Sequence, residues 1–551
     1  MLKQTFNCAA LLLGLLAGCG PDRLVPPDRL VHSDRLPLPQ APKSRSPSLA
    51  NEILEMSFGL QIKQGLDLPR QVRRLTGNPY QALDLDNFDR VANSSWFTNR
   101  NGTTPMSLEA IGRGPTRGSG PDTTGPWHVV ALKDAGVTPG LTIVDNRGDR
   151  YIIKFDPPDF AELPSGTEVV ASRLFYAAGY NTPENYIAVL DPDKLVPDPE
   201  AVLSVSTPDK RNPIQERPLT QADLDAVLAR ANPGGKPVRV LASRFLPGRP
   251  VGPWSYTGTR RSDLNDIYPH QHRRVIRGFY VIASWLNHAD MKEENTLDMY
   301  DPQARVLTHY LIDFGASMGS NSRGPSNPRR GQANSFDLKD SLTRLGTLGL
   351  YVHGYEKAPR TVRYPSVGYL ENELFRPEAW KPMYPVPAFE NMTDRDAFWG
   401  AQIVTAFSDA QIAAAVETGQ FSDPEAAAYM VRFLTERRDA IGRYWFARVN
   451  PLDGFVVEGD RLVGMDLAVT RGYADGAKTQ YELEVLAPDG RQLARTTAPT
   501  PELKLQSDWL HTSRLIVSLR PHRPGLKAQP VLLYLTAIAG QWRLEGLRRQ
   551  N

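Results

Sequence analysis

The feature that most constrains this chain lies between residues 288 and 315, after a segment, 270–286, whose apolar face predicts a long helix. It begins with the polar stretch His288-Ala-Asp-Met-Lys-Glu-Glu-Asn295. Two predicted strands, 296–300 and 308–312, follow, and the short motif Asp313-Phe-Gly315 comes directly after them. Asn295 comes directly before the first strand, and Asp313 directly after the second. These side chains offer a neutral and a charged oxygen, and oxygen ligands are the ones that Mg²⁺ prefers.

This order and spacing resemble the catalytic loop and the metal-binding motif of protein kinases. In that family an Asp orients the acceptor hydroxyl, an Asn five residues later holds Mg²⁺, and the Asp of a DFG motif holds the metal against the phosphates of ATP. The resemblance implies that Asp290 orients the acceptor and that Lys292 steadies the transferred phosphoryl group. It also implies that Asn295 and Asp313 bind Mg²⁺.

A second part of the resemblance lies upstream, where alternating apolar residues predict strands that lead to Tyr151-Ile-Ile-Lys154. This strand resembles the kinase V-A-I-K strand, so Lys154 would contact the α and β phosphates of ATP with a compact ammonium group. Ser165-Gly-Thr-Glu168 predicts a capping box that opens a helix ending at Gly179. Glu168 would pair with Lys154. The alternative is a solvent-facing lysine and a glutamate that only caps its own helix.

Several kinase features are absent from the sequence. No G-x-G-x-x-G covers the phosphates, and Gly136-Val-Thr-Pro-Gly140 stands in its place. Ala289 replaces the usual Arg of the catalytic loop, and no A-P-E motif follows the Ser, Gly and Arg-rich residues 316–335. These departures resemble the atypical kinases of the HipA and CotH types, and the resemblance covers residues 126–449.

The sequence therefore predicts an α+β fold: a two-lobed protein-kinase-like domain followed by a small all-β sandwich. Alternating strands between Pro and Gly turns after residue 450 predict the sandwich. The expected segments are a signal peptide (1–18), a Pro-rich tether (19–47), an N-terminal extension (48–125), an N-lobe (126–247) that contains an insertion (192–237), a helical C-lobe (248–450) and the sandwich (451–551).

The N-terminus resembles that of a bacterial lipoprotein. A short basic start precedes an apolar stretch that is too short to span a bilayer, and Leu16-Ala-Gly-Cys19 follows. This resembles a lipobox, which implies that Cys19 carries acyl chains that attach the protein to a membrane. Gly20 after the cysteine is typical of lipoproteins sent to the outer membrane. We therefore expect an exported protein of the cell envelope.

Composition excludes some chemistry. The net charge is +3, from 64 basic and 61 acidic residues, so we expect no nucleic-acid surface. The only cysteines are Cys8 and Cys19, so the mature fold contains no disulfide, cysteine nucleophile or cysteine-bound zinc.

The expected function is transfer of the γ-phosphoryl group of ATP, with Mg²⁺, to an unidentified hydroxyl acceptor. The alternative is an inactive kinase-like scaffold whose β domain engages an envelope partner. AMP transfer is a third hypothesis. A fourth is acyl hydrolysis by Ser317 in Gly315-Ala-Ser-Met-Gly319, with His353 or His511 as the base, although the prolines at 325 and 328 oppose the helix that such a nucleophile requires.

Overall fold

The computed structural model describes residues 24–46, 55, 59–132, 139–206, 214–321, 323–526 and 528–550. The expected signal peptide, Cys19 and most of the Gly136–Gly140 loop lie outside the described residues. The chain divides into two compact units, a larger one made by the described parts of 33–83 and 92–442, and a smaller one made by those of 1–32, 84–91 and 443–551. Within the described ranges no helix is long and apolar enough to cross a membrane.

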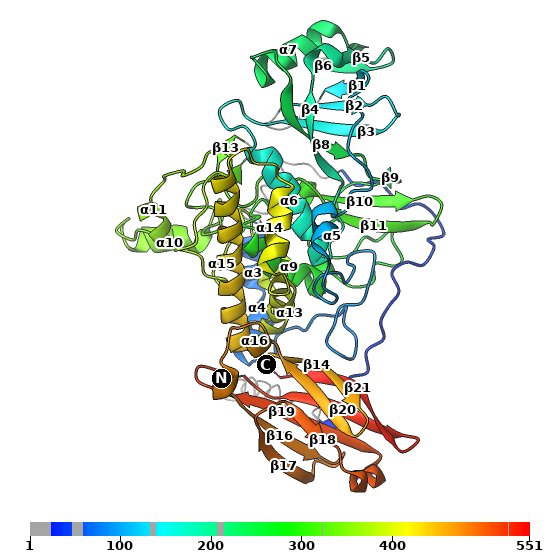
Figure 1. Cartoon of the computed structure of the whole chain (residues 1–551), viewed down its shortest axis with the longest axis vertical. Helices are drawn as coiled ribbons and strands as arrows, with labels where there is room; N and C mark the ends of the chain where they lie inside the picture. Colours follow the sequence, from blue (N-terminus) through cyan, green and yellow to red (C-terminus); the bar gives the residue numbers. More distant parts are fainter. Residues whose placement is uncertain are drawn as a thin grey trace, which may run out of the picture. The chain divides into compact units, whose positions relative to one another are not determined.

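The larger unit contains a six-stranded sheet in the order β4-β8-β3-β2-β1-β5 (Figure 1). Its strands are β1 (Trp127–Leu132), β2 (Gly140–Val144), β3 (Arg150–Phe155), β4 (Asn185–Leu190), β5 (Leu195–Pro197) and β8 (Val238–Arg244). Neighbours are antiparallel except β1 and β5. On β3, Tyr151, Ile153 and Phe155 are buried in the core of this lobe, and the two-residue period places Lys154 on the opposite face of the sheet.

The predicted insertion covers this core. It contains the short helix η3 (Pro192–Lys194), the hairpin β6 (Val202–Ser206) and β7 (Ile214–Pro218), and the helix α7 (Gln221–Ala231). The capping box formed by Thr220 and Asp223 starts α7. Leu224 and Val227 of this helix join the core under the sheet, so the segment is an integral part of the lobe.

The helix α6 (Leu163–Ala178) follows β3 and carries Glu168. All but two of its residues are buried, which is typical of a helix covered on every side. It ends at Gly179, as predicted, where the backbone has a φ of +122° and a Cβ atom would come within 2.1 Å of the Phe97 ring.

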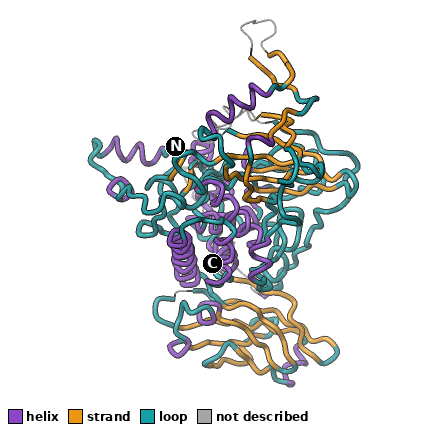
Figure 2. Tube along the Cα trace, turned by 45° about the horizontal axis from the view of Figure 1, so that its top comes forward, coloured by secondary structure: helices purple, strands orange, loops and turns teal. Residues whose placement is uncertain are grey.

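The rest of the larger unit is mainly helical, and Figure 2 shows its helices gathered apart from the sheet. The helices are α3 (Leu60–Leu66), α4 (Leu68–Leu75), α5 (Leu108–Arg113), η4 (His270–His272), α8 (Arg274–Arg277), α9 (Phe279–Trp285), η5 (Glu293–Asn295), α10 (Leu338–Gly346), α11 (Gly354–Lys357), α12 (Pro387–Glu390), α13 (Asp394–Val404), α14 (Asp409–Glu417) and α15 (Pro424–Arg448). The strands are β9 (Arg249–Pro250), β10 (Thr296–Asp301), β11 (Val306–Leu311), β12 (Ser320–Asn321) and β13 (Gly324–Pro325).

The single long helix predicted over 270–286 is wrong, because the structure divides it into η4, α8 and α9. The break before α9 lies at Gly278, where α13 crosses closely. A Cβ atom on Gly278 would come within 2.4 Å of Trp399, and one on Gly400 within 2.6 Å of the Gly278 carbonyl oxygen. The apolar period continues across the break, so the pattern alone does not reveal it.

The smaller unit is an all-β sandwich, which confirms the fold class predicted for the C-terminal part. One sheet contains β14 (Leu452–Glu458), β15 (Arg461–Asp466) and β18 (Glu502–Lys504); the other has the order β17 (Gln492–Ala498), β16 (Gln480–Leu486), β19 (Arg514–His522), β20 (Val531–Ile538) and β21 (Gln541–Arg549). Three short helices connect the strands: α16 (Leu467–Thr470), η6 (Gly476–Lys478) and η7 (Ser507–Thr512). Leu462 of the first sheet and Val517 of the second lie in one buried core.

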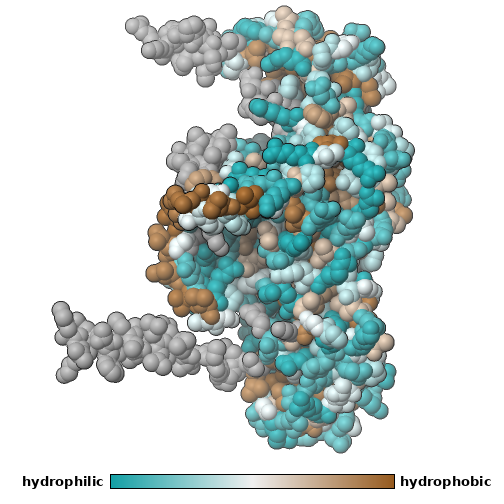
Figure 3. Space-filling model, turned by 90° about the vertical axis from the view of Figure 1, so that its left-hand side faces the viewer, coloured by the Kyte–Doolittle hydropathy of each residue, from teal (hydrophilic) through white to brown (hydrophobic). Residues whose placement is uncertain are grey.

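Hydrophobic side chains are exposed on α10 and the turn after it, which project on the side viewed in Figure 3. Leu345, Leu348 and Leu350 are 73%, 89% and 84% exposed. Leu348 also has a positive φ of 51°.

Candidate active site

Lys154 lies at the centre of the candidate site. Its Nζ atom is 3.0 Å from Oε2 and 3.2 Å from Oε1 of Glu168, and 3.0 Å from Oδ1 of Asp313. Burial alone would lower the pKa of this ammonium group, but the charges of Asp313 and Glu168 outweigh burial and raise the pKa above its ordinary value. Lys154 is therefore fully charged at neutral pH, as a phosphate ligand must be.

Glu168 reaches Lys154 from the second turn of α6, so its predicted place in a capping box is wrong. The helix begins at Leu163, with Pro164 in its first turn and Glu162 before it in the left-handed conformation. Ser165 does not cap the helix, since its hydroxyl donates a 2.6 Å hydrogen bond to Asp156. Glu168 thus lies inside the helix, where its side chain is only 4% exposed.

The Asp313-Phe-Gly315 motif follows β11 and packs against α6. Phe314 is fully buried, with its ring centroid 5.0 Å from that of Phe175 on α6 and 5.8 Å from that of His288. A Cβ atom on Gly315 would come within 3.2 Å of Oε2 of Glu168. These contacts hold Asp313 beside Lys154 while its side chain remains 49% exposed.

The predicted catalytic loop is joined to this motif by the β10–β11 hairpin. Thr296 pairs with Leu311, and the Ile312 amide donates a 3.0 Å hydrogen bond to the Asn295 carbonyl oxygen, so Asn295 lies next to the chain segment that carries Asp313. The Asn295 side-chain amide donates a 2.8 Å hydrogen bond to the carbonyl oxygen of Asp290. This bond uses the nitrogen of the amide and leaves its oxygen to serve as a ligand.

Asp290 and Lys292 lie together in the same loop, with Nζ of Lys292 3.4 Å from Oδ2 of Asp290. Burial would lower the pKa of Lys292, but the charge of Asp290 outweighs burial and raises it. Both side chains are partly exposed, at 18% for Asp290 and 24% for Lys292. An acceptor group can therefore reach them.

Arg330 is a residue of the site that the sequence does not reveal. Burial lowers the pKa of its guanidinium group, and the nearby charge of Asp290 partly offsets that effect. Its Nη1 atom is buried, and no described residue offers it a hydrogen bond. The only sequence signal is an arginine-rich loop, which has no fixed spacing from the motifs.

His288 has a structural place in the site. Its Nδ1 atom is 2.9 Å from the Ser317 hydroxyl oxygen, and burial lowers its pKa to about 4. The ring is therefore neutral at pH 7. It packs against Phe175 and Phe314 and supports the DFG-like motif.

The geometry around Ser317 does not match an acyl hydrolase. Ser317 is fully buried, and the short strand β12 follows it where a nucleophile elbow would enter a helix. His353 is hydrogen-bonded to the Asp340 side chain, and His511 is hydrogen-bonded to the carbonyl oxygen of Asp508.

The donor set fits Mg²⁺ held together with phosphates. Among the described residues no cluster of three or more His, Cys, Asp and Glu side chains encloses a metal position. Asp313 and Asn295 instead supply two protein oxygens near a lysine. Mg²⁺ is typically held by one or two carboxylates, with water and substrate phosphates completing its octahedron.

Comparisons with known proteins add little to this geometry. No family model matches the chain, and no match occurs among curated proteins. Among solved structures, the chain is similar to the Helicobacter pylori proinflammatory kinase CtkA, with 12% identity, a TM-score of 0.29, and coverage of 57% of this chain and 95% of that one. It is also similar to the Golgi casein kinase, with 9% identity, a TM-score of 0.26, and coverage of 73% and 94%. Superpositions this loose do not establish a fold. The kinase-like character of the fold therefore rests on the chain itself: a sheet, a helix whose glutamate pairs with the lysine of that sheet, and a helical lobe that carries the acidic groups.

Proposed function

We propose that this protein is an ATP-dependent phosphotransferase that moves the γ-phosphoryl group to a hydroxyl acceptor with the assistance of Mg²⁺. The observation that supports the proposal is the position of the Lys154 ammonium, within 3.2 Å of both oxygens of Glu168 and 3.0 Å from Asp313. A charged lysine fixed by an internal glutamate, next to a more exposed aspartate, suits the binding of phosphate and metal.

Each side chain then has a defined role. Lys154 neutralises the α and β phosphates, and Glu168 keeps Lys154 in position. Asp313 and Asn295 hold Mg²⁺, which supplies positive charge beside the phosphates. Asp290 orients the acceptor hydroxyl and accepts its proton as the new oxygen–phosphorus bond forms and the bond to ADP breaks. Lys292 and Arg330 add positive charge near the transferred group.

The proposal also includes the location of the protein. The lipobox-like sequence that ends at Cys19 supports export and attachment to a membrane of the cell envelope, the outer membrane in particular. The missing glycine-rich motif and Ala289 in the catalytic loop support an atypical kinase of the HipA or CotH type. The smaller unit is available for a partner in the envelope.

The test is incubation of the full chain with Mg²⁺ and ATP labelled at either the γ or the α position. We expect the γ label, and not the α label, to move to the chain itself or to water. Transfer of the α label would instead support AMP transfer. The absence of both, with no thermal shift on adding nucleotide, would support the scaffold.

Substitutions in the candidate active site test whether the activity belongs to these residues. Asp313→Asn should abolish Mg²⁺-dependent nucleotide binding, and Asp290→Asn should retain binding while removing turnover. Lys154→Met should weaken nucleotide binding, because it removes the ammonium group that neutralises the α and β phosphates. Lys236→Met, on an exposed loop of the same lobe, is its matched control. Normal Mg²⁺-nucleotide binding by Asp313→Asn would contradict the site.

A further inference from the structure

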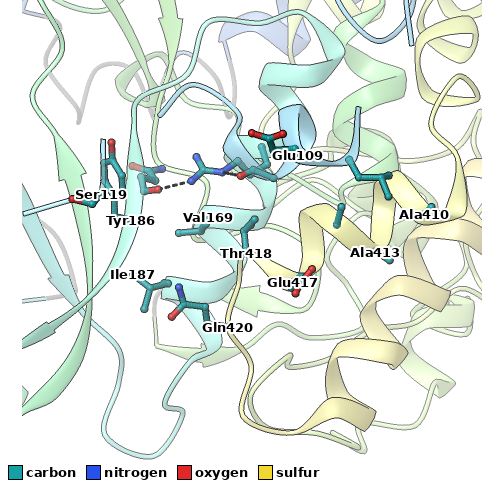
Figure 4. A pocket seen from close by; sticks show the side chains of 15 residues that line it. Glu109, Ser119, Val169, Tyr186, Ile187, Ala410, Ala413, Glu417, Thr418 and Gln420 are labelled. Carbon is teal, nitrogen blue, oxygen red and sulfur yellow. Dashed lines mark hydrogen bonds between the residues drawn. The ribbon is translucent and has the colours of Figure 1, made fainter. Parts of the chain in front are cut away.

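A cavity of about 910 Å³ lies against α6, and its wall is formed by α5, α6, β4 and α14 (Figure 4). Its lining is largely apolar and includes Leu108, Val169, Ile187 and Ala413. Sites for small molecules typically have volumes of about 300–1,000 Å³ and apolar walls with a few polar groups. The cavity therefore has the size and the character of a ligand site.

The cavity faces a different side of α6 from Lys154. At 3.6 residues per turn, Val169 and Arg173 point about 100° and about 140° away from Glu168 around the helix. Both residues line the cavity. The helix thus has Lys154 on one side and this cavity on another.

Arg173 is a buried cation that has no acidic partner among the described residues. Its Nε donates a 2.8 Å hydrogen bond to the Gly112 carbonyl oxygen and its Nη2 a 3.1 Å hydrogen bond to the Asn185 carbonyl oxygen, and both acceptors are neutral. In the described part of the chain, no carboxylate lies within ion-pair distance of it and its Nη1 has no hydrogen-bond partner. Burial lowers the pKa of Arg173 to about 10, and burying an uncompensated charge costs free energy.

Glu184, a carboxylate whose charge acts on Arg173, is already engaged by other groups. Its Oε2 accepts hydrogen bonds of 2.7 Å from the Tyr186 hydroxyl and 3.1 Å from the Arg117 amide, and it lies 3.8 Å from Arg244. It therefore cannot neutralise the guanidinium group of Arg173 as well.

Asn185 presents a second unsatisfied group in the same wall. It is fully buried, and neither its Oδ1 nor its Nδ2 atom has a hydrogen-bond partner among the described residues. Exchanging the two amide atoms does not remove this deficit. A carboxylate between Arg173 and Asn185 would accept hydrogen bonds from both.

We propose that this cavity binds a small monocarboxylate with an apolar acyl or aryl body, which acts as an effector of α6. The carboxylate would compensate Arg173, and the body would cover Leu108, Val169 and Ile187. A ligand with several negative charges is disfavoured, because Glu109 and Glu417 are exposed residues of the same lining.

The effect on the candidate active site follows from the shared helix and rests on the proposed function. Val169 is the neighbour of Glu168, so a ligand that packs against it favours the position of α6 in which Glu168 meets Lys154. Coupling between two binding sites is reciprocal. The carboxylate and Mg²⁺-ATP should therefore strengthen each other's binding by the same factor.

The binding test uses straight-chain and phenyl-substituted monocarboxylates of four to ten carbons and the matched primary alcohols, titrated into the full chain without nucleotide and followed by calorimetry and thermal shift. At least one carboxylate should bind with a submillimolar Kd, and its alcohol at least about tenfold more weakly, the factor expected from one charge-assisted hydrogen bond. Equal binding of acid and alcohol, or no binding by any acid, would overturn the proposal.

Three variants test where the ligand binds. Ala413→Trp fills the cavity from an exposed position on α14 and should abolish binding, whereas Ala428→Trp, on an exposed position of α15, should leave it unchanged. Arg173→Met should remove the preference for acid over alcohol. If Arg173→Met does not fold, the tryptophan pair still decides the site: unchanged binding by Ala413→Trp excludes this cavity.

The coupling is measured as the change in the Kd of the best carboxylate on adding Mg²⁺-ATP. A tighter Kd in wild type that is lost in Glu168→Gln supports the effector role, and an unchanged Kd refutes it. Failure of the phosphotransferase proposal would leave the nucleotide-free binding result intact, so the two failures are distinguishable.

Discussion

Lys154 has two carboxylate partners with different environments. Glu168 is buried inside α6, and the side chain of Asp313 is half exposed. A buried partner cannot be replaced by water without cost, whereas an exposed one exchanges its contacts easily. Glu168 is therefore the fixed support of the lysine, and Asp313 is the partner that can exchange the lysine for another cation.

We expect Glu168→Gln to lower kcat/KM for ATP by about ten- to a hundredfold, because a charge-assisted hydrogen bond to Lys154 becomes a neutral one. Steady-state kinetics with labelled ATP measures the change. Glu200→Gln, at an exposed position of the same lobe, should have no effect. Equal kinetics in both variants would show that Glu168 does not support Lys154.

His288 should make folding depend on pH. Its pKa is lowered from 6.5 to about 4 in the folded protein, so the unfolded chain takes up a proton first as the pH falls. The free energy of unfolding should therefore decrease between pH 6.5 and pH 4, by up to about 3 kcal/mol from this residue. His288→Asn retains an N–H near Ser317 and does not titrate, so its urea midpoint should fall less than that of wild type over this range. Parallel pH profiles for the two proteins would contradict the role of the buried ring.

At the scale of residues, the sequence predicted the positions that share a fixed spacing. Asp290, Asn295 and Asp313 are ordered by one loop and one hairpin, and the register of β10 and β11 brings their segments together. The sequence did not predict Arg330, because a loop without repeating geometry places its charge near that of Asp290. The sequence did not predict the unsatisfied hydrogen-bonding atoms of Arg173 and Asn185 either, because burial and missing hydrogen-bond partners leave no local sequence pattern.

At the scale of elements, strands were easier to predict than helix ends. The alternation of apolar residues located β3, β10 and β11 to within about two residues. The start of α6 was misread because Ser165-Gly-Thr-Glu168 has the capping-box spacing, although the preceding Pro164 already fits the first turn. A tertiary contact, the hydroxyl of Ser165 on Asp156, decides the role of the serine.

The crossing of α9 and α13 gives a prediction about stability. Gly278→Ala should lower the free energy of unfolding by about 1–3 kcal/mol, because the added methyl group meets the Trp399 ring at 2.4 Å. Gly346→Ala, at the end of α10 with no atom within 4 Å of the new methyl group, is the matched control and should be neutral or slightly stabilising. Denaturation by urea measures both, and a loss of similar size in both variants would contradict the close crossing.

At the scale of the whole molecule, the sequence predicted the fold class but missed a segment of the smaller unit. Residues 84–91 belong to it, and Phe88 packs against the sandwich core. The Asn87 carbonyl oxygen accepts a 2.8 Å hydrogen bond from the Leu547 amide. No periodic pattern marks these residues, because a single strand-like contact far along the chain leaves no local signal.

The exposed leucines at the end of α10 and after it give a prediction for the intact protein (Figure 3). Replacing them together as Leu345→Gln, Leu348→Asn and Leu350→Gln should reduce the fluorescence of a bound hydrophobic dye. Each change should alter the free energy of unfolding by less than about 0.5 kcal/mol, and asparagine tolerates the positive φ at 348. Leu264→Gln, another exposed leucine, serves as the control. Undiminished dye fluorescence would show that these leucines do not form the exposed hydrophobic surface.

The contact between Lys154 and Asp313 has a consequence for the order in which ligands associate. Oδ1 of Asp313 already lies 3.0 Å from the Lys154 ammonium group. A divalent ion that binds without nucleotide therefore meets a carboxylate whose charge is already neutralised by the lysine. Lys154 must first be drawn toward an incoming phosphate before Asp313 is released. We therefore expect sequential loading, with nucleotide ahead of metal, and little retention of Mg²⁺ by the empty protein.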